Sequence, residues 1–297
     1  MPRSRPDFRR DRFKPMESDC PIMARRLLLA LAALASLSPP VWAAPPQRIV
    51  SLNLCADQLV ALLVEPSRIA ALSKLSRDRS LSYVAEMADS LPQAQPNAES
   101  VLSFKPDIVL AGRLSATPTV SFLKSKGVPI LQISLLSSFD GIRQQTRSVG
   151  KALGAEARAE QLIAEMDALL NADADQGDAS DGGTRPRPSA LTWQPGGFTS
   201  GSGTLIDAVL DAAGFDNLAS RRGLKGYGFL TLESVVDGRP DLLISDDALP
   251  DPPSLRQSLL AHPALHPKAG GVGARTVTPP PLTACAGPFT AQAVAML

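Results

Sequence analysis

The sequence predicts an α/β protein of two Rossmann-like lobes, each with a central parallel sheet, joined by one long α-helix. Short apolar strands alternate with helical stretches in both halves of the chain, which is typical of βα units on a parallel sheet. Between the halves, residues 138–172 contain no proline and repeat apolar residues at helical spacing. One unit also occurs twice, as AESVLSFKPDIVLA from Ala98 and LESVVDGRPDLLIS from Leu232, so each lobe is expected to carry one copy.

Residues 1–43 are expected to form a leader and a secretory signal peptide rather than part of the fold. Arg25 and Arg26 precede a short apolar stretch, and small residues allow cleavage near Ala43. The stretch is too short to span a membrane as a helix, and a buried N-terminal helix is the alternative. Residues 1–22 are polar and arginine-rich, so the start is expected at Met23 rather than Met1.

Charge and cysteine content narrow the class of protein. The whole chain carries a net charge of +1, and residues 1–43 hold eight basic and four acidic residues, so the mature chain carries −3. This near balance gives no electrostatic footprint for nucleic acid, and no such partner is expected. Cys20 leaves with the leader, whereas Cys55 and Cys285 remain. An even pair in an exported protein favours a disulfide.

Residues 44–137 are expected to form the N-terminal lobe. Apolar runs bounded by turn residues predict its strands at 47–52, 68–72, 107–111 and 128–134. Helical spacing between these runs predicts helices at 56–63, 97–104 and 119–127. Asn97 suits the N-cap of the second helix, and Gly127 suits the position that closes the third.

Residues 138–172 are expected to form a single linking helix, with Gly150 and Gly154 as weak points. A helix of about 35 residues would span about 50 Å. The polar, Gly/Asp-rich residues 173–188 are expected to form a flexible loop. Alternation then restarts in the C-terminal lobe, residues 189–297, with strands expected at 189–193, 240–245 and 276–281 and helices at 203–214, 231–238 and 290–297.

Four stretches of the chain carry a resemblance to a known family. They are RIVSLNLCADQL from Arg48, the two repeated units, and GFTSGSGTLIDAVLDAAGFDNLA from Gly197. In this order they resemble the periplasmic solute-binding proteins of ABC importers for iron chelates, haem and cobalamin, of the class with a single-helix hinge. The resemblance covers residues 47–297. It implies two lobes that hinge little, a ligand cleft between them, and a metal chelate as the ligand: cobalamin, haem or a ferric siderophore.

The same resemblance gives the paired glutamates of the repeat a role. In the family, one glutamate on each lobe meets arginines on the two subunits of the membrane permease, and these glutamates correspond to Glu99 and Glu233. A permease dimer needs two similar contacts, and charge-assisted pairs with arginine add orientation. The alternative is local, because a glutamate in the first turn of a helix stabilises the helix dipole by about 0.3–1 kcal/mol without any partner.

The ligand is expected at the carboxyl ends of the strands, where α/β sheets place their ligands. Candidate residues in both lobes follow predicted strands or lie in nearby loops: Asn53, Cys55, Tyr83, Trp193, Phe198, Tyr227, Asp246 and Cys285. Aromatic walls of this kind suit a large flat ligand. For Trp193 the alternative is a place in the core, because it also fits the end of a strand.

Three interpretations of Cys55 and Cys285 remain open from the sequence. A disulfide would tie the lobes across or beside the site. Free thiolates would instead ligate haem iron, or the metal of an iron or cobalt chelate. The third interpretation is a pair of unbonded buried thiols.

Other chemistry is scarce in this sequence. There is no P-loop lysine, so the ATPase of an importer is expected to be a separate chain. His262 and His266 have helical spacing, but Pro263 and Pro267 disfavour the helix, and no metal site is expected. No cofactor is expected beyond the iron or cobalt of the ligand, and the chain is expected to be a monomer. The alternative function is an exported enzyme that acts on a tetrapyrrole or metal chelate through a cysteine in the cleft.

Overall fold

The computed structural model describes residues 44–178, 186–245, 259–267 and 270–297. The chain divides into two units, residues 1–44 and 45–297, and the second carries all the elements that follow. The predicted leader and signal peptide, residues 179–185 of the predicted loop, and Asp246 lie outside the described residues.

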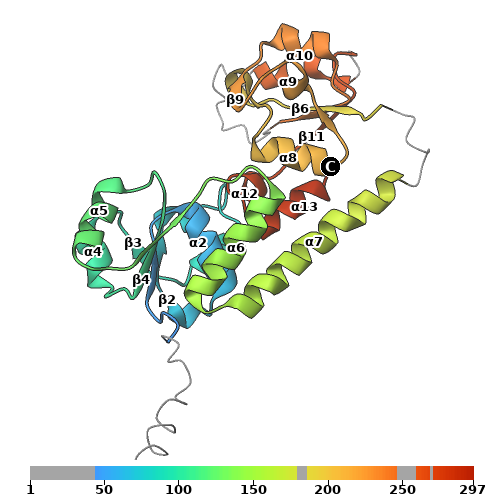
Figure 1. Cartoon of the computed structure of the whole chain (residues 1–297). Helices are drawn as coiled ribbons and strands as arrows, with labels where there is room; N and C mark the ends of the chain where they lie inside the picture. The colour runs from blue at the N-terminus through green and yellow to red at the C-terminus, as the bar shows by residue number, and fades with distance from the viewer. Residues whose placement is uncertain (1–43, 179–185, 246–258, 268–269) are drawn as a thin grey trace, which may run out of the picture. The chain divides into compact units, whose positions relative to one another are not determined.

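The N-terminal lobe has a five-stranded sheet in which every pair is parallel, as predicted (Figure 1). The strand order is β3-β2-β1-β4-β5. The strands are β1 (Ile49–Ser51), β2 (Ile69–Ser73), β3 (Gln93–Ala94), β4 (Ile108–Gly112) and β5 (Ile130–Ile133). The helices of this lobe are α2 (Leu54–Leu63), α3 (Ala85–Ala88), α4 (Ala98–Ser103) and α5 (Thr117–Ser125). Both β3 and α3 were absent from the sequence prediction, because they are too short to show a periodicity.

The C-terminal lobe has a four-stranded parallel sheet in the order β11-β10-β6-β8 and an antiparallel ribbon of β7 and β9. Its strands are β6 (Ser189–Thr192), β7 (Phe198–Ser200), β8 (Asp216–Asn217), β9 (Tyr227–Phe229), β10 (Leu242–Ile244) and β11 (Ala274–Thr276). Its helices are α8 (Leu205–Ala212), α9 (Leu218–Arg221) and α10 (Leu232–Gly238). The strand predicted at 276–281 is wrong beyond its first residue, because the prolines that follow open α12 (Pro280–Thr283).

The repeated unit has the same construction in both lobes. Asn97 caps α4 by accepting a hydrogen bond from the Ser100 amide, and Thr231 caps α10 through the Ser234 amide. Each helix is followed by a basic residue in the left-handed region, Lys105 at φ 46° and Arg239 at φ 42°. The chain then turns through Pro-Asp into β4 or β10.

The aspartate of each Pro-Asp pair holds the neighbouring strand. Asp107 accepts hydrogen bonds from the Gln47 and Arg48 amides at 2.7 and 2.9 Å, just before β1. Asp241 accepts from the amide and hydroxyl of Ser189 at 2.7 and 2.8 Å, at the start of β6. These bonds lower the pKa of Asp241 because they favour the carboxylate. Pro-Asp is therefore repeated for a structural reason, independent of any role of the glutamates.

The single linking helix predicted at 138–172 is wrong. The structure has two helices, α6 (Phe139–Leu153) and α7 (Glu156–Asp178), that pack side by side as a hairpin (Figure 1). Gly154 ends α6 in the left-handed conformation, φ 62° and ψ 44°, so it is a terminator rather than a weak point. At Gly150 a Cβ would lie 2.6 Å from the Ala159 Cβ, so glycine allows the close approach of α7. The loop predicted to begin at residue 173 instead continues α7 to Asp178.

The last segment of the chain packs against helices from three parts of the fold. This C-terminal segment, residues 280–297, contains α12 and α13 (Ala291–Val294). Its apolar side chains form one buried cluster with residues of α2, α6, α7 and α8: Leu54, Phe139, Ile142, Met166, Leu205, Val209, Leu282, Cys285, Phe289 and Val294. Burial of this apolar surface holds the C-terminal segment against α7, where the sequence had predicted only a short final helix.

Candidate functional site

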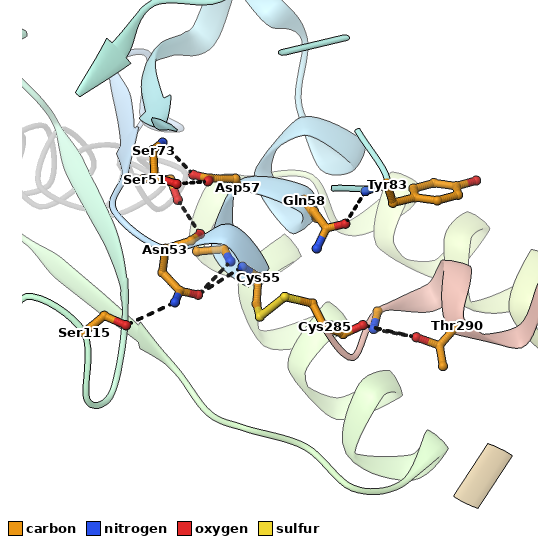
Figure 2. Close-up of a disulfide and its surroundings, with 12 residues drawn as sticks. Ser51, Asn53, Cys55, Asp57, Gln58, Ser73, Tyr83, Ser115, Cys285 and Thr290 are labelled. Carbon is orange, nitrogen blue, oxygen red and sulfur yellow. Dashed lines mark hydrogen bonds between the residues drawn. A yellow bond between two sulfur atoms is a disulfide. The ribbon is translucent and has the colours of Figure 1, made fainter. Parts of the chain in front are cut away.

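The carboxyl edge of the first sheet is organised by Asn53, which follows β1. Its side-chain oxygen caps α2 by accepting from the amides of Cys55 and Ala56 at 3.0 and 3.3 Å. Its amide nitrogen donates to the Ser115 hydroxyl at 3.1 Å, in the loop after β4 (Figure 2). Asn53 therefore ties together two loops at the edge where a ligand was predicted.

Two hollows open at this edge and share Asn53 and Ser115 in their walls. The larger, here called the β4–β5 hollow, has a volume of about 480 Å³ and is bordered by Cys55, Arg113, Leu114 and Leu135. The smaller, here called the β2 hollow, has about 320 Å³ and is bordered by Ser73, Lys74 and Leu75.

Two leucines at the β4–β5 hollow are unusually open to solvent. Leu114 is 86% exposed and Leu135 is 88% exposed. Large apolar side chains grouped at a concave surface mark a binding site. Neither leucine was predicted as a site residue, because in the sequence each resembles an ordinary residue at the end of an apolar strand.

Behind the β2 hollow, Asp57 fixes the backbone. Its fully buried carboxylate accepts bonds from the amide and hydroxyl of Ser73, and Ser51 contributes another (Figure 2). Burial raises the pKa of Asp57, while the bonds from the two serines oppose the rise. Because this group has no exposed surface, it supports the loops of the site and does not reach a ligand.

Cys55 and Cys285 form a disulfide, with their Cα atoms 5.2 Å apart (Figure 2). Cys55 is half-buried at the β4–β5 hollow, whereas Cys285 is 4% exposed within the apolar cluster of the C-terminal segment. The interpretation of these residues as free thiolates or unbonded thiols is therefore wrong. The Cys285 side chain is covered and borders neither hollow, so the structure does not bring it together with the other predicted ligand residues.

Tyr83 lies on the other side of the disulfide from Asn53 and points away from it (Figure 2). Its ring stacks on Phe289 at 4.6 Å between centroids, and its hydroxyl accepts from Gln292 at 2.8 Å. It lines neither of the two hollows and borders a separate, open one. The structure therefore places Tyr83 as a contact to the C-terminal segment rather than beside the predicted ligand residues.

Trp193 is a core residue, as the alternative had it, and not a wall of the site. It is 1% exposed, and its indole nitrogen donates to the Leu230 carbonyl at 2.9 Å. The side chain packs with Leu191, Val235 and Leu243 in one buried apolar cluster. A tryptophan just after a buried strand takes the orientation that fills the core.

The β7–β9 ribbon instead carries an aromatic patch, defined by Phe198, Tyr227 and Phe229. Phe198 stacks on Tyr227 at 5.8 Å and meets Phe229 edge-on at 5.7 Å. Tyr227 is 64% exposed and Phe229 is 71% exposed. Phe198 and Tyr227 were predicted, whereas Phe229 was missed. Its position two residues after Tyr227 could have revealed it, because alternate residues of a strand share a face.

Glu99 and Glu233 are both exposed, in the first turns of α4 and α10. A hydrogen bond from its own backbone amide, then one from the Thr231 hydroxyl, lowers the pKa of Glu233, with a smaller contribution from His262.

His262 caps a short 3₁₀ turn through the Ala264 amide. Among the described residues, no three or more His, Cys, Asp or Glu side chains gather as a metal site.

No helix in the described ranges is both long enough and apolar enough to cross a membrane.

Two α/β lobes joined by the α6–α7 hairpin, with exposed apolar side chains after β4 and β5 and on the β7–β9 ribbon, are typical of a solute-binding protein. The chain belongs to the periplasmic binding protein family, whose pattern matches residues 49–270. This is a family of substrate-binding proteins, which favours the binding interpretation over the exported enzyme.

Individual relatives agree with this assignment. The cobalamin-binding protein of Halobacterium salinarum is 29% identical over 201 residues, 67% of this chain and 54% of that protein. The molybdate-binding protein MolA of Haemophilus influenzae is 22% identical over 62% of this chain and 58% of its own length. The chain thus spans about half the length of the curated relatives it matches.

Solved structures show the same architecture. The periplasmic haem-binding protein RhuT from Roseiflexus sp. RS-1 aligns with a TM-score of 0.66 at 26% identity, over 84% of this chain and 95% of that one. The periplasmic vitamin B12 binding protein BtuF of Vibrio cholerae aligns with a TM-score of 0.61 at 16% identity, over 85% and 95% of the two chains. The latter likeness shows the fold alone.

Proposed function

We propose that this chain is the substrate-binding component of an ABC importer and that it binds a metal chelate: cobalamin, haem or a ferric siderophore. The observation that carries the proposal is a pair of exposed apolar surfaces, one after strands β4 and β5 and one on the β7–β9 ribbon. One is formed by Leu114 and Leu135 in the first lobe, the other by the aromatic patch in the second. Surfaces of this kind suit a large, flat, partly apolar ligand.

The partners follow from the proposed role. The chain delivers its ligand to a permease dimer in the inner membrane, and a separate ATPase drives transport. It is exported by the signal peptide, cleaved near Ala43, and works in the periplasm as a monomer. The ligand brings its own iron or cobalt. Relatives named for cobalamin and haem support this range of ligands.

Removing the aromatic patch tests where the ligand binds. We expect Tyr227→Ala and Phe229→Ala each to weaken chelate binding about tenfold, because each ring supplies stacking and apolar contact worth roughly 1–2 kcal/mol. Trp193 can report binding, because the other tryptophan, Trp42, lies in the predicted signal peptide. Titrations of haemin, cyanocobalamin and ferrioxamine B would follow quenching of its fluorescence.

The matched control is Phe122→Ala. Phe122 is also an exposed phenylalanine, at 46%, but it lies on α5 away from both the aromatic patch and the two hollows. Its removal should leave the dissociation constant unchanged. If the ribbon variants bind as tightly as the control, the aromatic patch is not part of the site.

A further inference from the structure

We infer that the bound chelate carries acidic groups, and that Arg113 in the β4–β5 hollow and Lys74 in the β2 hollow receive them. This inference rests on the proposed function and specifies the charge of the ligand. It separates an anionic chelate, such as haem with its two carboxylates, from the neutral or cationic chelates that share its size.

The first support is the unpaired state of Arg113. The other arginines of residues 44–137 are all bonded to carbonyls or to a carboxylate: Arg48, Arg68, Arg77 and Arg79. Arg113 borders the β4–β5 hollow. Within the described part of the chain, its side chain has no hydrogen bond or ion pair. A guanidinium beside two exposed leucines suits a ligand that joins a carboxylate or phosphate to an apolar body.

The second support is the charge of the walls. The β4–β5 hollow contains Arg113 and the β2 hollow contains Lys74, and neither wall contains Asp or Glu. The mature chain nevertheless has a net charge of −3, so both cationic walls differ from the average surface. Asp57 bonds to the lining residue Ser73, but its carboxylate is fully buried and offers no surface to a ligand.

The third support is the arrangement of the two hollows. They share Asn53 and Ser115, whose side chains are hydrogen-bonded to each other, so the hollows are adjacent on one edge of the sheet. A cation in each hollow suits a ligand with two acidic groups on one rim. Haem has this form, whereas cyanocobalamin carries one phosphodiester balanced by its cobalt, and ferrioxamine B carries a positive charge.

The test compares these three probes on the mature chain and on charge variants, with Trp193 fluorescence as the readout. We expect Arg113→Gln to weaken haemin binding about 3- to 30-fold and Lys74→Gln about 2- to 10-fold, with smaller losses at high salt. Arg113→Lys should retain most of the affinity, because it keeps the charge. Binding of ferrioxamine B should be weak and should not fall in either variant.

Lys151→Gln is the control, because it removes one exposed positive charge from α6, outside both hollows. The inference is overturned if the double variant Arg113→Gln/Lys74→Gln binds haemin within twofold of this control. It is also overturned if cyanocobalamin binds more tightly than haemin and is insensitive to both changes; the proposed function then stands. If none of the three probes binds, the proposed function fails together with this inference.

Discussion

The mature chain without its disulfide is expected to lose about 3–5 kcal/mol of its free energy of unfolding. The bond joins residues 230 positions apart, so it removes a large loop entropy from the unfolded chain. It also fastens the C-terminal segment to α2, where Phe289 and Tyr83 stack beside it. Urea unfolding of the oxidised chain and of the Cys55→Ala/Cys285→Ala variant would measure the difference.

Reduction of the unmodified chain provides the control for this prediction. Under a thiol reductant its unfolding midpoint should fall to that of the double variant, whose midpoint should not respond to the reductant. The oxidised mature chain should also show no free thiol after denaturation, since Cys55 and Cys285 are its only cysteines. Equal midpoints for the oxidised chain and the double variant would contradict the expected stabilisation.

Charge reversal of both repeat glutamates is expected to abolish uptake while leaving ligand affinity unchanged. Glu99 and Glu233 are exposed and border neither of the two hollows, so Glu99→Lys/Glu233→Lys should bind the chelate normally. If the glutamates meet arginines of the permease, two lysines set like charges against each other at both contacts. Folding stability should fall by no more than about 1 kcal/mol per site, the helix-dipole contribution. Uptake by cells and calorimetric binding would be measured on the same variants.

Glu156→Lys is the matched control for the docking prediction. Glu156 is also an exposed glutamate in the first turn of a helix, α7, but it lies outside the repeated unit, two residues after Gly154. This change carries the same helix-dipole cost and should leave uptake intact. Normal uptake by the double reversal variant would leave the helix dipole as a sufficient explanation of both glutamates.

Sheet topology was accessible from the sequence because it depends on patterns that are local and repeated. The apolar runs at β1, β4, β6 and β10 and the duplicated Pro-Asp unit were enough to predict two parallel sheets, and the pairing of strands confirms them. The N-cap Asn97 was predicted for the same reason. Such features depend on neighbours a few residues away, and these neighbours are visible in the chain.

The orientation of side chains and the contacts between residues far apart in the chain could not be predicted from the sequence in the same way. From the sequence, Gly154 could have been either a weak point within one helix or the end of a helix. The structure shows that it ends α6, and that α7 then packs back closely enough for Ala159 to lie against Gly150. Trp193 follows a strand, and only the packed core shows that it faces inward. Arg113 stands out only after every neighbouring arginine is seen to be bonded. The sequence could therefore indicate the region of the candidate residues, at the strand ends, whereas the direction of each side chain became visible only in the structure.

The absorption spectrum of the protein purified from its own periplasm would show whether this chain carries a metal chelate, because haem, corrinoids and many ferric siderophores absorb visible light. We expect a visible band from a bound chelate at about one equivalent per chain, or the appearance of such a complex when haemin or cyanocobalamin is added to colourless protein. A protein that has no visible band, and whose spectrum and Trp193 fluorescence do not change with any of the three chelates, would contradict this expectation.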